Sequence, residues 1–275
     1  MAPGPQTAMQ LEVITRVPAG APRPAPLLFE HGAWHAAWCW EEHFLDYFAR
    51  HGFAAHALSL RGHGASEGRN RLRWTRISEY VADVAQIAAG LPSVPIVIGH
   101  SMGGLVVQKY LETHGTPAGA LLASAPPAGA LAATLRIAAR QPLAFAKANL
   151  TLSLWPLVAT PALAREAFFS SSMPDAQLRE LASRLQDESY RAFLDLLALD
   201  LPHPDRIQTP LLVLGAADDA VFSPAEVAAT ARAYRTEPIM FDGMAHDMML
   251  EAGWERVADQ ILAWLKARTP QTWPR

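Results

Sequence analysis

Short apolar runs recur along the chain, and longer stretches with helical periodicity separate them. The runs have the length of β-strands and are bounded by Gly, Pro or polar residues. Val94–Gly99 is almost continuously apolar, as expected of a strand buried on both faces of a sheet. The predicted strands are Leu11–Val17, Pro26–Glu30, Phe53–Leu60, Val94–Gly99, Ala118–Ser124, Pro210–Gly215 and Pro238–Phe241.

Helical patterns lie between most of these runs. The predicted helices are Trp38–His51, Ile77–Gly90, Gly104–His114, Pro224–Tyr234 and Trp254–Ala267. Alternation of strands with helices is typical of a parallel sheet covered by helices on both faces. The pattern therefore predicts an α/β fold with a mostly parallel sheet.

One interval, residues 126–205, breaks the alternation, because no strand is predicted in it. Its helical patterns are Leu131–Asn149, Pro161–Phe169, Ala176–Leu185 and Tyr190–Leu199. We interpret it as a helical cap inserted in an α/β core formed by residues 1–125 and 206–275; the alternative is that these helices belong to the main layers. The Pro-rich ends, Ala2–Pro5 and Thr269–Arg275, are expected to be tails.

Length, composition and charge favour a compact enzyme and argue against a nucleic-acid-binding protein. At roughly 100–200 residues per domain, 275 residues correspond to one large domain or one domain with an insertion. Hydrophobic residues make up 51% and charged residues 18%, which favours a compact enzyme with an apolar cavity. The net charge of -3 and the lack of a basic patch argue against a nucleic-acid partner.

Localisation is expected to be cytoplasmic. The N-terminus lacks the pattern of a signal peptide, and the most apolar stretch, Ala118–Ala133, is too short to span a bilayer, so no membrane partner is expected. Cys39 is the single cysteine, which excludes an internal disulfide and suits a reducing compartment. The expected partner is a small-molecule substrate, and the oligomeric state is not predicted.

A Gly-x-Ser-x-Gly pattern occurs twice, and the surroundings of the two serines differ. Ser101 lies in Gly99–Gly103, between an apolar strand and the helical pattern Gly104–His114. In such a strand-to-helix turn, the glycines let neighbouring segments approach and leave the serine hydroxyl exposed above the sheet. Ser66, in Gly64–Gly68, belongs to a polar stretch and is expected to be a loop residue. The sequence therefore predicts Ser101 as a nucleophile.

His246 and an acid after a neighbouring strand are the candidates to activate this serine. A serine hydroxyl is a weak nucleophile until a base accepts its proton, and His246 follows the last strand by a short loop. The base needs a carboxylate to hold its tautomer. Asp219 is favoured because Val221 would anchor its turn in the core, and the adjacent Asp218 stays open. The chain order serine, acid, histidine is the one that this fold class uses.

Acyl transfer also requires donors for the developing oxyanion. The backbone N–H of Met102, directly after the nucleophile, is one candidate. The N–H of Ala33 is the other, because Gly32 lets the loop after the second strand approach closely; a plain tight turn is the alternative for that loop. Trp34 and His100, next to these donors, are candidates for contact with the substrate.

Several of these segments together resemble the α/β-hydrolase superfamily over nearly the whole chain. They are HGAWHAAWCW (31–40), RGHGAS (61–66), GHSMGG (99–104) and the loops of Asp219 and His246. The first segment resembles the plant methylesterase and hydroxynitrile lyase branch and many bacterial esterase-like hydrolases. In that branch the acid loop resembles Asp-x-Ile-Phe-x-Pro, and DAVFSP (219–224) matches it, which again favours Asp219. Residues 126–205 resemble no segment that we can name.

These observations predict a serine hydrolase that cleaves a carboxylic ester, with an apolar acyl or aromatic portion, by two-step acyl transfer. Alternatives on the same triad are carbon–carbon bond hydrolysis, lactone opening and cyanohydrin cleavage. A cofactor-independent oxygenase, a perhydrolase and a hydrolase-fold binding module have less support, the last because no triad member is missing. No metal-ligand spacing and no Rossmann or Walker glycine pattern occurs, so neither a metal nor a cofactor is expected.

Overall fold

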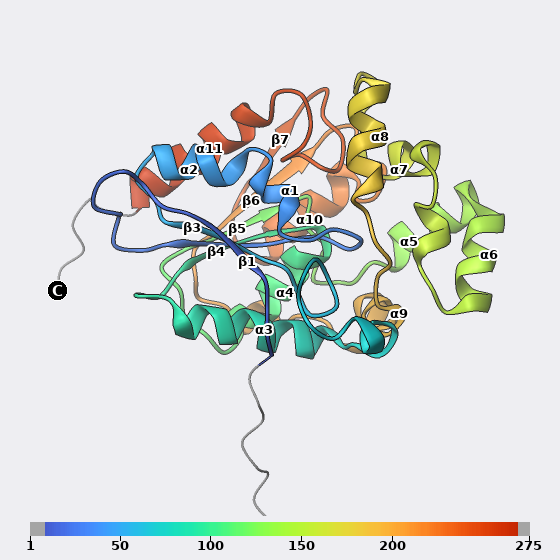
Figure 1. Ribbon diagram of the computed structural model, residues 1–275, viewed down its shortest axis with the longest axis horizontal. Coiled ribbons are helices and arrows are strands. Elements are labelled where there is room, and N and C mark those ends of the chain that lie inside the picture. Colours follow the sequence, from blue (N-terminus) through green and yellow to red (C-terminus); the bar gives the residue numbers. More distant parts are fainter. Residues whose placement is uncertain (1–8, 269–275) are drawn as a thin grey trace, which may run out of the picture.

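The seven apolar runs form the seven strands of one sheet in the computed structural model, which describes residues 9–268 (Figure 1). The Pro-rich ends predicted at Ala2–Pro5 and Thr269–Arg275 lie outside the described residues. The strands are β1 (Val13–Arg16), β2 (Leu27–Glu30), β3 (Ala55–Leu58), β4 (Ile96–His100), β5 (Gly119–Leu122), β6 (Leu211–Ala216) and β7 (Pro238–Phe241).

The strand order is β1-β3-β2-β4-β5-β6-β7, and all pairs are parallel except β1 with β3. The predicted mostly parallel sheet is therefore confirmed. The registers align the carboxyl ends of the central strands: His100 pairs with Leu122, which in turn pairs with Leu214. Loops that follow these strands meet at one edge, which is where α/β sheets place their ligands.

Helices cover both faces of this sheet and bury two apolar clusters against it. One cluster includes side chains of α1 (Trp38–Glu41), α2 (Phe44–Arg50) and α11 (Trp254–Arg268). The other includes side chains of α3 (Ile77–Gly90), α4 (Ser101–Leu111) and α10 (Pro224–Ala233). Cys39 is fully buried in the first cluster, as expected of a small apolar side chain. None of the helices in residues 9–268 is long and apolar enough to cross a membrane.

Residues 126–205 form helices and loops between β5 and β6, and no strand occurs among them. Their helices lie together to one side of the sheet in Figure 1. They are α5 (Leu131–Arg140), α6 (Pro142–Thr151), α7 (Pro161–Phe168), α8 (Asp175–Ser183) and α9 (Tyr190–Leu194), with helical turns at Trp155–Leu157, Asp195–Leu199 and Pro204–Arg206.

Two helices predicted as continuous are broken. Trp38–His51 divides into α1 and α2 at His43, whose backbone leaves the helical region with φ -142°. Leu131–Asn149 divides into α5 and α6 at Gln141, which precedes Pro142 and adopts φ -128°, ψ 57°. A residue before proline avoids the helical region because the proline ring clashes with it.

Glu30, at the end of β2, is the most unusual residue of the core. Its side chain is fully buried, and neither carboxylate oxygen has a hydrogen-bond partner among the described residues. Burial raises the pKa of Glu30 well above 4.5, and the charge of Asp83 adds to this effect. The folded protein therefore keeps a proton that the unfolded chain releases. Stability from this group is full below about pH 4.5 and is lost as the pH rises toward the folded-state pKa.

We expect Glu30→Met, which keeps a side chain of similar size, to raise the free energy of unfolding at pH 8 by about 1–3 kcal/mol, because it removes an unsatisfied buried polar group. The variant should also lose less stability between pH 5 and pH 8 than the wild type. Urea unfolding at both pH values measures the two effects. Glu237→Met, at an exposed glutamate, is the matched control and should change little. Equal pH dependence in wild type and Glu30→Met would show that another group is responsible.

Candidate active site

Ser101 lies at the junction of β4 and α4, in a strained backbone conformation. Its φ is +53°, in the left-handed region that residues with a side chain rarely adopt. This turn is possible because its neighbours are glycines: a Cβ on Gly103 would collide with the carbonyl oxygen of His31, and one on Gly104 would collide with Ser124. The sharp turn presents the hydroxyl at the N-terminus of α4, where the residue is 9% exposed.

His246 contacts the serine, and an aspartate contacts His246. The Nε2 atom of His246 lies 2.9 Å from the Oγ atom of Ser101. Its Nδ1 atom lies 2.8 Å from the Oδ2 atom of Asp219. His246 comes from the loop after β7, and Asp219 follows β6, so the parallel register brings the three residues together from three strand ends.

The geometry also separates the two adjacent aspartates. The Oδ1 atom of Asp219 accepts the backbone N–H groups of Val221 at 2.7 Å and Phe222 at 3.0 Å, which leaves Oδ2 for His246. Asp218 is exposed, and its backbone N–H donates to the carbonyl oxygen of Met244 at 3.0 Å. Asp219 is therefore the acid that the structure brings to the base.

The charges around His246 favour its protonated form. Burial alone would lower the pKa of His246, but the charge and hydrogen bond of Asp219, with a smaller effect from Asp247, raise it above the usual value. An imidazole beside a carboxylate can accept the serine proton and hold the resulting positive charge. The arrangement thus suits a general base that becomes an imidazolium during the reaction.

Both predicted oxyanion donors belong to residues at the same cavity as the serine. Ala33 and Met102 line it together with Ser101. Met102 occupies the first turn of α4, where backbone N–H groups have no partner within the helix and can bind an anion. Gly32 packs so closely that a Cβ would lie 2.8 Å from His100 Nδ1, so a glycine is required for this loop to approach.

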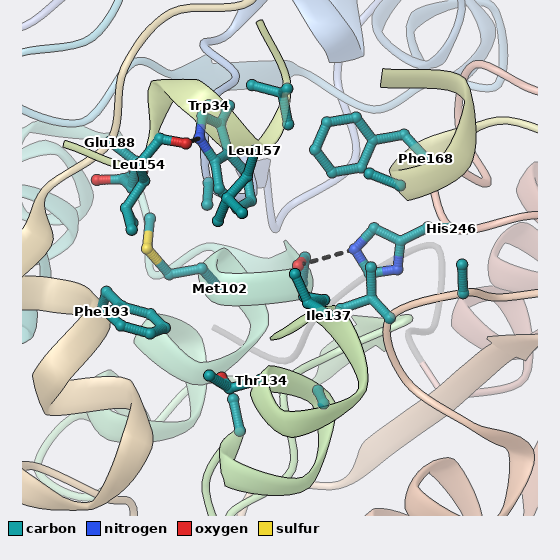
Figure 2. A pocket seen from close by; sticks show the side chains of 18 of the residues that line it. Trp34, Met102, Thr134, Ile137, Leu154, Leu157, Phe168, Glu188, Phe193 and His246 are labelled. Atoms are coloured by element: carbon teal, nitrogen blue, oxygen red, sulfur yellow. Dashed lines mark hydrogen bonds between the residues drawn. The ribbon is translucent and has the colours of Figure 1, made fainter. Parts of the chain in front are cut away.

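The cavity above the serine is apolar and encloses about 960 Å³, including the part open to solvent (Figure 2). Most of the residues that line it belong to the segment 126–205. Among the residues that line it are Ala133, Ile137, Phe145, Leu154, Leu157, Val158, Phe168 and Phe193.

Trp34 and His100, the two candidates for substrate contact, are placed differently. Trp34 lines the cavity; its Nε1 donates to the carbonyl oxygen of Leu154 at 3.3 Å and its ring packs on Phe168. His100 is not among the lining residues. Its Nε2 lies 3.0 Å from the carbonyl oxygen of His246, and burial and the nearby His246 lower the pKa of His100 to about 3. A neutral His100 thus supports the base loop from behind.

Ser66, the serine of the second Gly-x-Ser-x-Gly pattern, is a loop residue, as predicted. Its hydroxyl donates to the carbonyl oxygen of Ser59 at 2.5 Å and accepts the backbone N–H of Glu12 at 2.8 Å. These bonds tie the loop to the start of the chain, and Ser66 is not among the residues that line the cavity.

Residues of the helical segment that sequence patterns did not single out also reach the site. The ring of Phe168 stacks near that of His246, with centroids 6.1 Å apart. Glu188 lines the cavity wall and is bound by His63 at 3.1 Å and by the hydroxyl of Tyr80 at 2.7 Å. Neither lies in a motif or near the triad in sequence, so only the three-dimensional packing identifies them.

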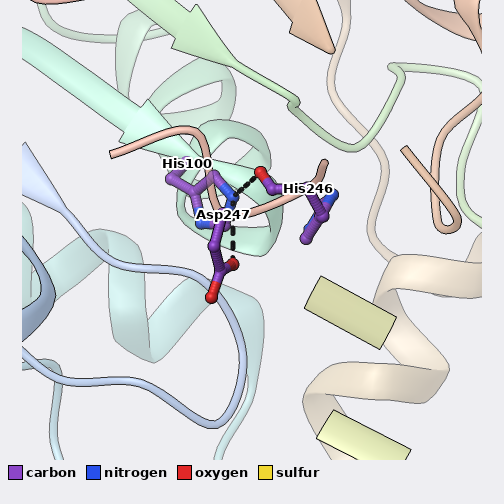
Figure 3. Close-up of side chains that lie close together, drawn as sticks. All are labelled: His100, His246 and Asp247. Atoms are coloured by element: carbon purple, nitrogen blue, oxygen red, sulfur yellow. Dashed lines mark hydrogen bonds and ion pairs between the residues drawn. The ribbon is translucent and has the colours of Figure 1, made fainter. Parts of the chain in front are cut away.

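One group of potential metal ligands occurs among the described residues: His100, His246 and Asp247, with one ligand atom of each within 4.8 Å of the others (Figure 3). Both ring nitrogens of His246 are already engaged, by Ser101 and Asp219. A metal ion would have to displace one of these contacts. The donor set therefore fits a hydrogen-bonded triad better than a metal centre.

Comparison with known proteins gives one family and many similar structures. A model of the family described as the alpha/beta hydrolase family matches residues 27–260. A monoacylglycerol lipase of Mycolicibacterium smegmatis is 37% identical over 89 residues, which cover 30% of this chain and 31% of that protein. The match thus spans about a third of the curated relative.

The similar solved structures share the fold at low sequence identity. A monoacylglycerol lipase of Paleococcus ferrophilus has a TM-score of 0.71 and 21% identity, covering 94% of this chain and 100% of that one. A putative non-heme bromoperoxidase of Mycobacterium tuberculosis has a TM-score of 0.73 and 20% identity, covering 96% and 97%. An enol-lactonase of Burkholderia xenovorans has a TM-score of 0.70 and 17% identity, covering 94% and 97%.

Proposed function

The chain belongs to the alpha/beta hydrolase family, and we propose that it hydrolyses carboxylic esters with an apolar acyl or aromatic portion, using Ser101 as nucleophile. The observation that carries this proposal is the chain of contacts from Ser101 Oγ to His246 and on to Asp219, at 2.9 Å and 2.8 Å, at the wall of an apolar cavity. This combination provides an activated hydroxyl and a place for an apolar group beside it.

The proposed reaction has two steps. Ser101 Oγ attacks the ester carbonyl while His246 Nε2 accepts its proton, and the backbone N–H groups of Ala33 and Met102 bind the oxyanion. His246 then returns the proton to the leaving alcohol, and an acyl-enzyme remains. In the second step His246 takes a proton from water, which attacks the acyl carbon; the bond from that carbon to Ser101 Oγ then breaks, His246 returns the proton to Oγ, and the acid is released. Asp219 keeps its negative charge throughout and stabilises the imidazolium.

We further propose that residues 126–205 act as a cap that shapes the acyl site. The support is that this segment supplies most of the residues that line the cavity, from α5 and α6 to Phe193 in α9. Several of the similar proteins, namely the monoacylglycerol lipases, an esterase and an enol-lactonase, act on acyl groups bound to oxygen, whereas the bromoperoxidase does not belong to this group. This shared chemistry favours ester hydrolysis over the carbon–carbon alternative.

Hydrolysis of p-nitrophenyl esters from acetyl to dodecanoyl tests the proposal. Release of p-nitrophenol, together with attachment of a fluorophosphonate probe to Ser101 in the peptide mass spectrum, would support it. A wild-type protein that is inert toward all esters but labelled at Ser101 would retain the nucleophile and shift the substrate to another acyl class. Inertness toward both would overturn the proposed function.

A substitution in the cavity wall should change the preferred chain length. Ala133 is buried and lines the cavity, so Ala133→Leu is expected to fill part of the acyl site. We expect kcat/KM for long-chain esters to fall by about 10–100-fold and that for the acetyl ester to stay nearly constant. Ala132→Leu, one position away on the exposed face of α5, is the matched control. An equal loss for all chain lengths would show that acyl chains do not occupy this part of the cavity.

A further inference from the structure

Three buried polar side chains lie behind the triad and have no part in the reaction proposed above. His35, His100 and Asp247 have side chains that are at most 1% exposed, and none of them lines the cavity. Asp247 directly follows His246, so whatever holds Asp247 also holds the base. Burial of an unpaired carboxylate is unfavourable in free energy. The partners of the buried Asp247 carboxylate therefore explain how it is held there.

Asp247 is held by histidines on two sides. Its Oδ2 atom lies 2.9 Å from His35 Nε2, and its Oδ1 atom lies 3.7 Å from His100 Nε2, the second contact being visible in Figure 3. Burial would raise the pKa of Asp247, but His35 in the first place, and then His100 and His246, hold it below its usual value. Asp247 is therefore ionised, and His35 is its main partner.

His35 connects this carboxylate to the loop of the oxyanion donors. Its Nδ1 atom lies 2.8 Å from the carbonyl oxygen of Ala33. A carbonyl oxygen can only accept, so Nδ1 carries a hydrogen and donates it. Nε2, on the other side of the ring, lies 2.9 Å from the carboxylate of Asp247. One imidazole thus bridges the Ala33 carbonyl and the residue next to the base.

The direction of a peptide carbonyl fixes the direction of the N–H in the same peptide. In a planar trans peptide the two groups point to opposite sides. The Gly32 carbonyl accepts from His31 Nδ1 at 2.8 Å, while His31 Nε2 accepts the N–H of Leu60 at 3.1 Å. The N–H of Ala33 therefore points away from His31. With His35 on the Ala33 carbonyl, both peptide planes that flank Ala33 are fixed by histidines.

Trp34, the residue after Ala33, has a strained backbone that other contacts must hold in place. Trp34 has φ +66°, a left-handed conformation that is uncommon for a residue with a large side chain. Such a conformation persists only where surrounding contacts impose it. The bond from His35 to the Ala33 carbonyl, and the bond from the Gln186 N–H to the Trp34 carbonyl at 3.0 Å, are contacts of this kind.

We propose that the His35–Asp247 contact is a positioning device that locks the oxyanion loop to the loop of His246, so that donor and base keep one separation. This inference rests on the proposed function of Ser101. Neither His35 nor Asp247 touches substrate; both act through Ala33 and His246.

Two substitutions at His35 each break one end of the connection. The amide nitrogen of asparagine takes roughly the place of Nδ1, so His35→Asn can keep the bond to Ala33 and loses Asp247. Glutamine reaches the place of Nε2, so His35→Gln can keep Asp247 and loses Ala33. If the connection matters, both variants should lower kcat by about 10–100-fold, because small displacements of catalytic groups have effects of this size. Asp247→Asn, which keeps shape and removes charge, should do the same.

The readout must separate positioning from stability. The affinity for a boronic acid that forms a tetrahedral adduct at Ser101 depends on the oxyanion donors and the base together. KM, in contrast, reports mainly binding of the substrate in its ground state. We expect the affinity for the boronic acid to fall by the same factor as kcat, with KM changing less than about threefold. Rates are normalised to the burst of p-nitrophenol, which counts correctly folded sites. His56→Gln, at a half-buried histidine bound to Thr15, is the control.

If either His35 variant had the same kcat and the same affinity for the boronic acid as the wild type, the inference would be wrong, even if the melting temperature of that variant were lower. If the His35 variants do not fold, Asp247→Asn decides by the same two measurements. A wild-type protein that neither hydrolyses esters nor binds the boronic acid would instead contradict the proposed function itself.

Discussion

Ser101→Ala is expected to lower kcat/KM for ester hydrolysis by about 10⁴–10⁶-fold and to abolish labelling by a fluorophosphonate. Removal of the nucleophile leaves only substrate binding and the oxyanion donors, whose residual contribution is small in triad enzymes. Fold and stability should be retained, because alanine fits the space of the serine. The two measurements are steady-state hydrolysis of the preferred p-nitrophenyl ester and probe labelling followed by mass spectrometry.

Ser66→Ala is the matched control, since Ser66 occupies the second Gly-x-Ser-x-Gly pattern. Its hydroxyl ties Ser59 to Glu12, so the variant should lose stability and keep its activity per folded molecule. A Ser101→Ala protein that hydrolyses esters at more than about 1% of the wild-type rate would show that another group is the nucleophile.

Asp219→Asn is expected to lower kcat by about 10⁴-fold, because the amide can stabilise the wrong tautomer of the base and does not stabilise an imidazolium. It should also change the pH profile. His246 must be neutral to act, and Asp219 raises the pKa of His246, so wild-type activity declines as the pH falls through this raised pKa. Without the carboxylate the pKa of His246 falls, and the acid limb of kcat/KM should move to lower pH. A series of rates from pH 5 to pH 9 measures the shift.

Asp218→Asn provides the comparison for Asp219→Asn, as the neighbouring acid is exposed and does not contact His246. We expect wild-type kcat and an unchanged acid limb from it. If Asp218→Asn lost activity and Asp219→Asn did not, the acid of the triad would have been assigned to the wrong residue.

The parts of the fold that depend on local pattern were predictable from the sequence. The strands could be located because each is a short apolar run, and the boundaries of α3 agree with the prediction at both ends. The triad could be proposed because each member follows a strand. Asp219 could be favoured over Asp218 from the sequence, and the turn geometry, in which Val221 and Phe222 bind the other carboxylate oxygen of Asp219, separates the two acids.

The features that could not be predicted from the sequence depend mainly on contacts between segments that are far apart along the chain. The wall of the cavity includes Phe168 and Glu188, whose positions follow from how α7 and the start of α9 pack on the core. The break between α1 and α2 lies at His43, whose backbone leaves the helical region, and no residue pattern there marks it. His100 directly precedes the nucleophile in sequence but does not line the cavity, because its side chain contacts the backbone carbonyl of His246.

The reaction of the buried Cys39 with a thiol reagent can report local unfolding of this protein. Cys39 is fully buried, and burial, with a further effect of Asp247, raises the pKa of its thiol well above the usual value. A thiol reagent can therefore attack it only while α1 is detached from the sheet. The labelling rate in native buffer measures the free energy of that local opening, with no engineered probe and no second cysteine to confuse the signal.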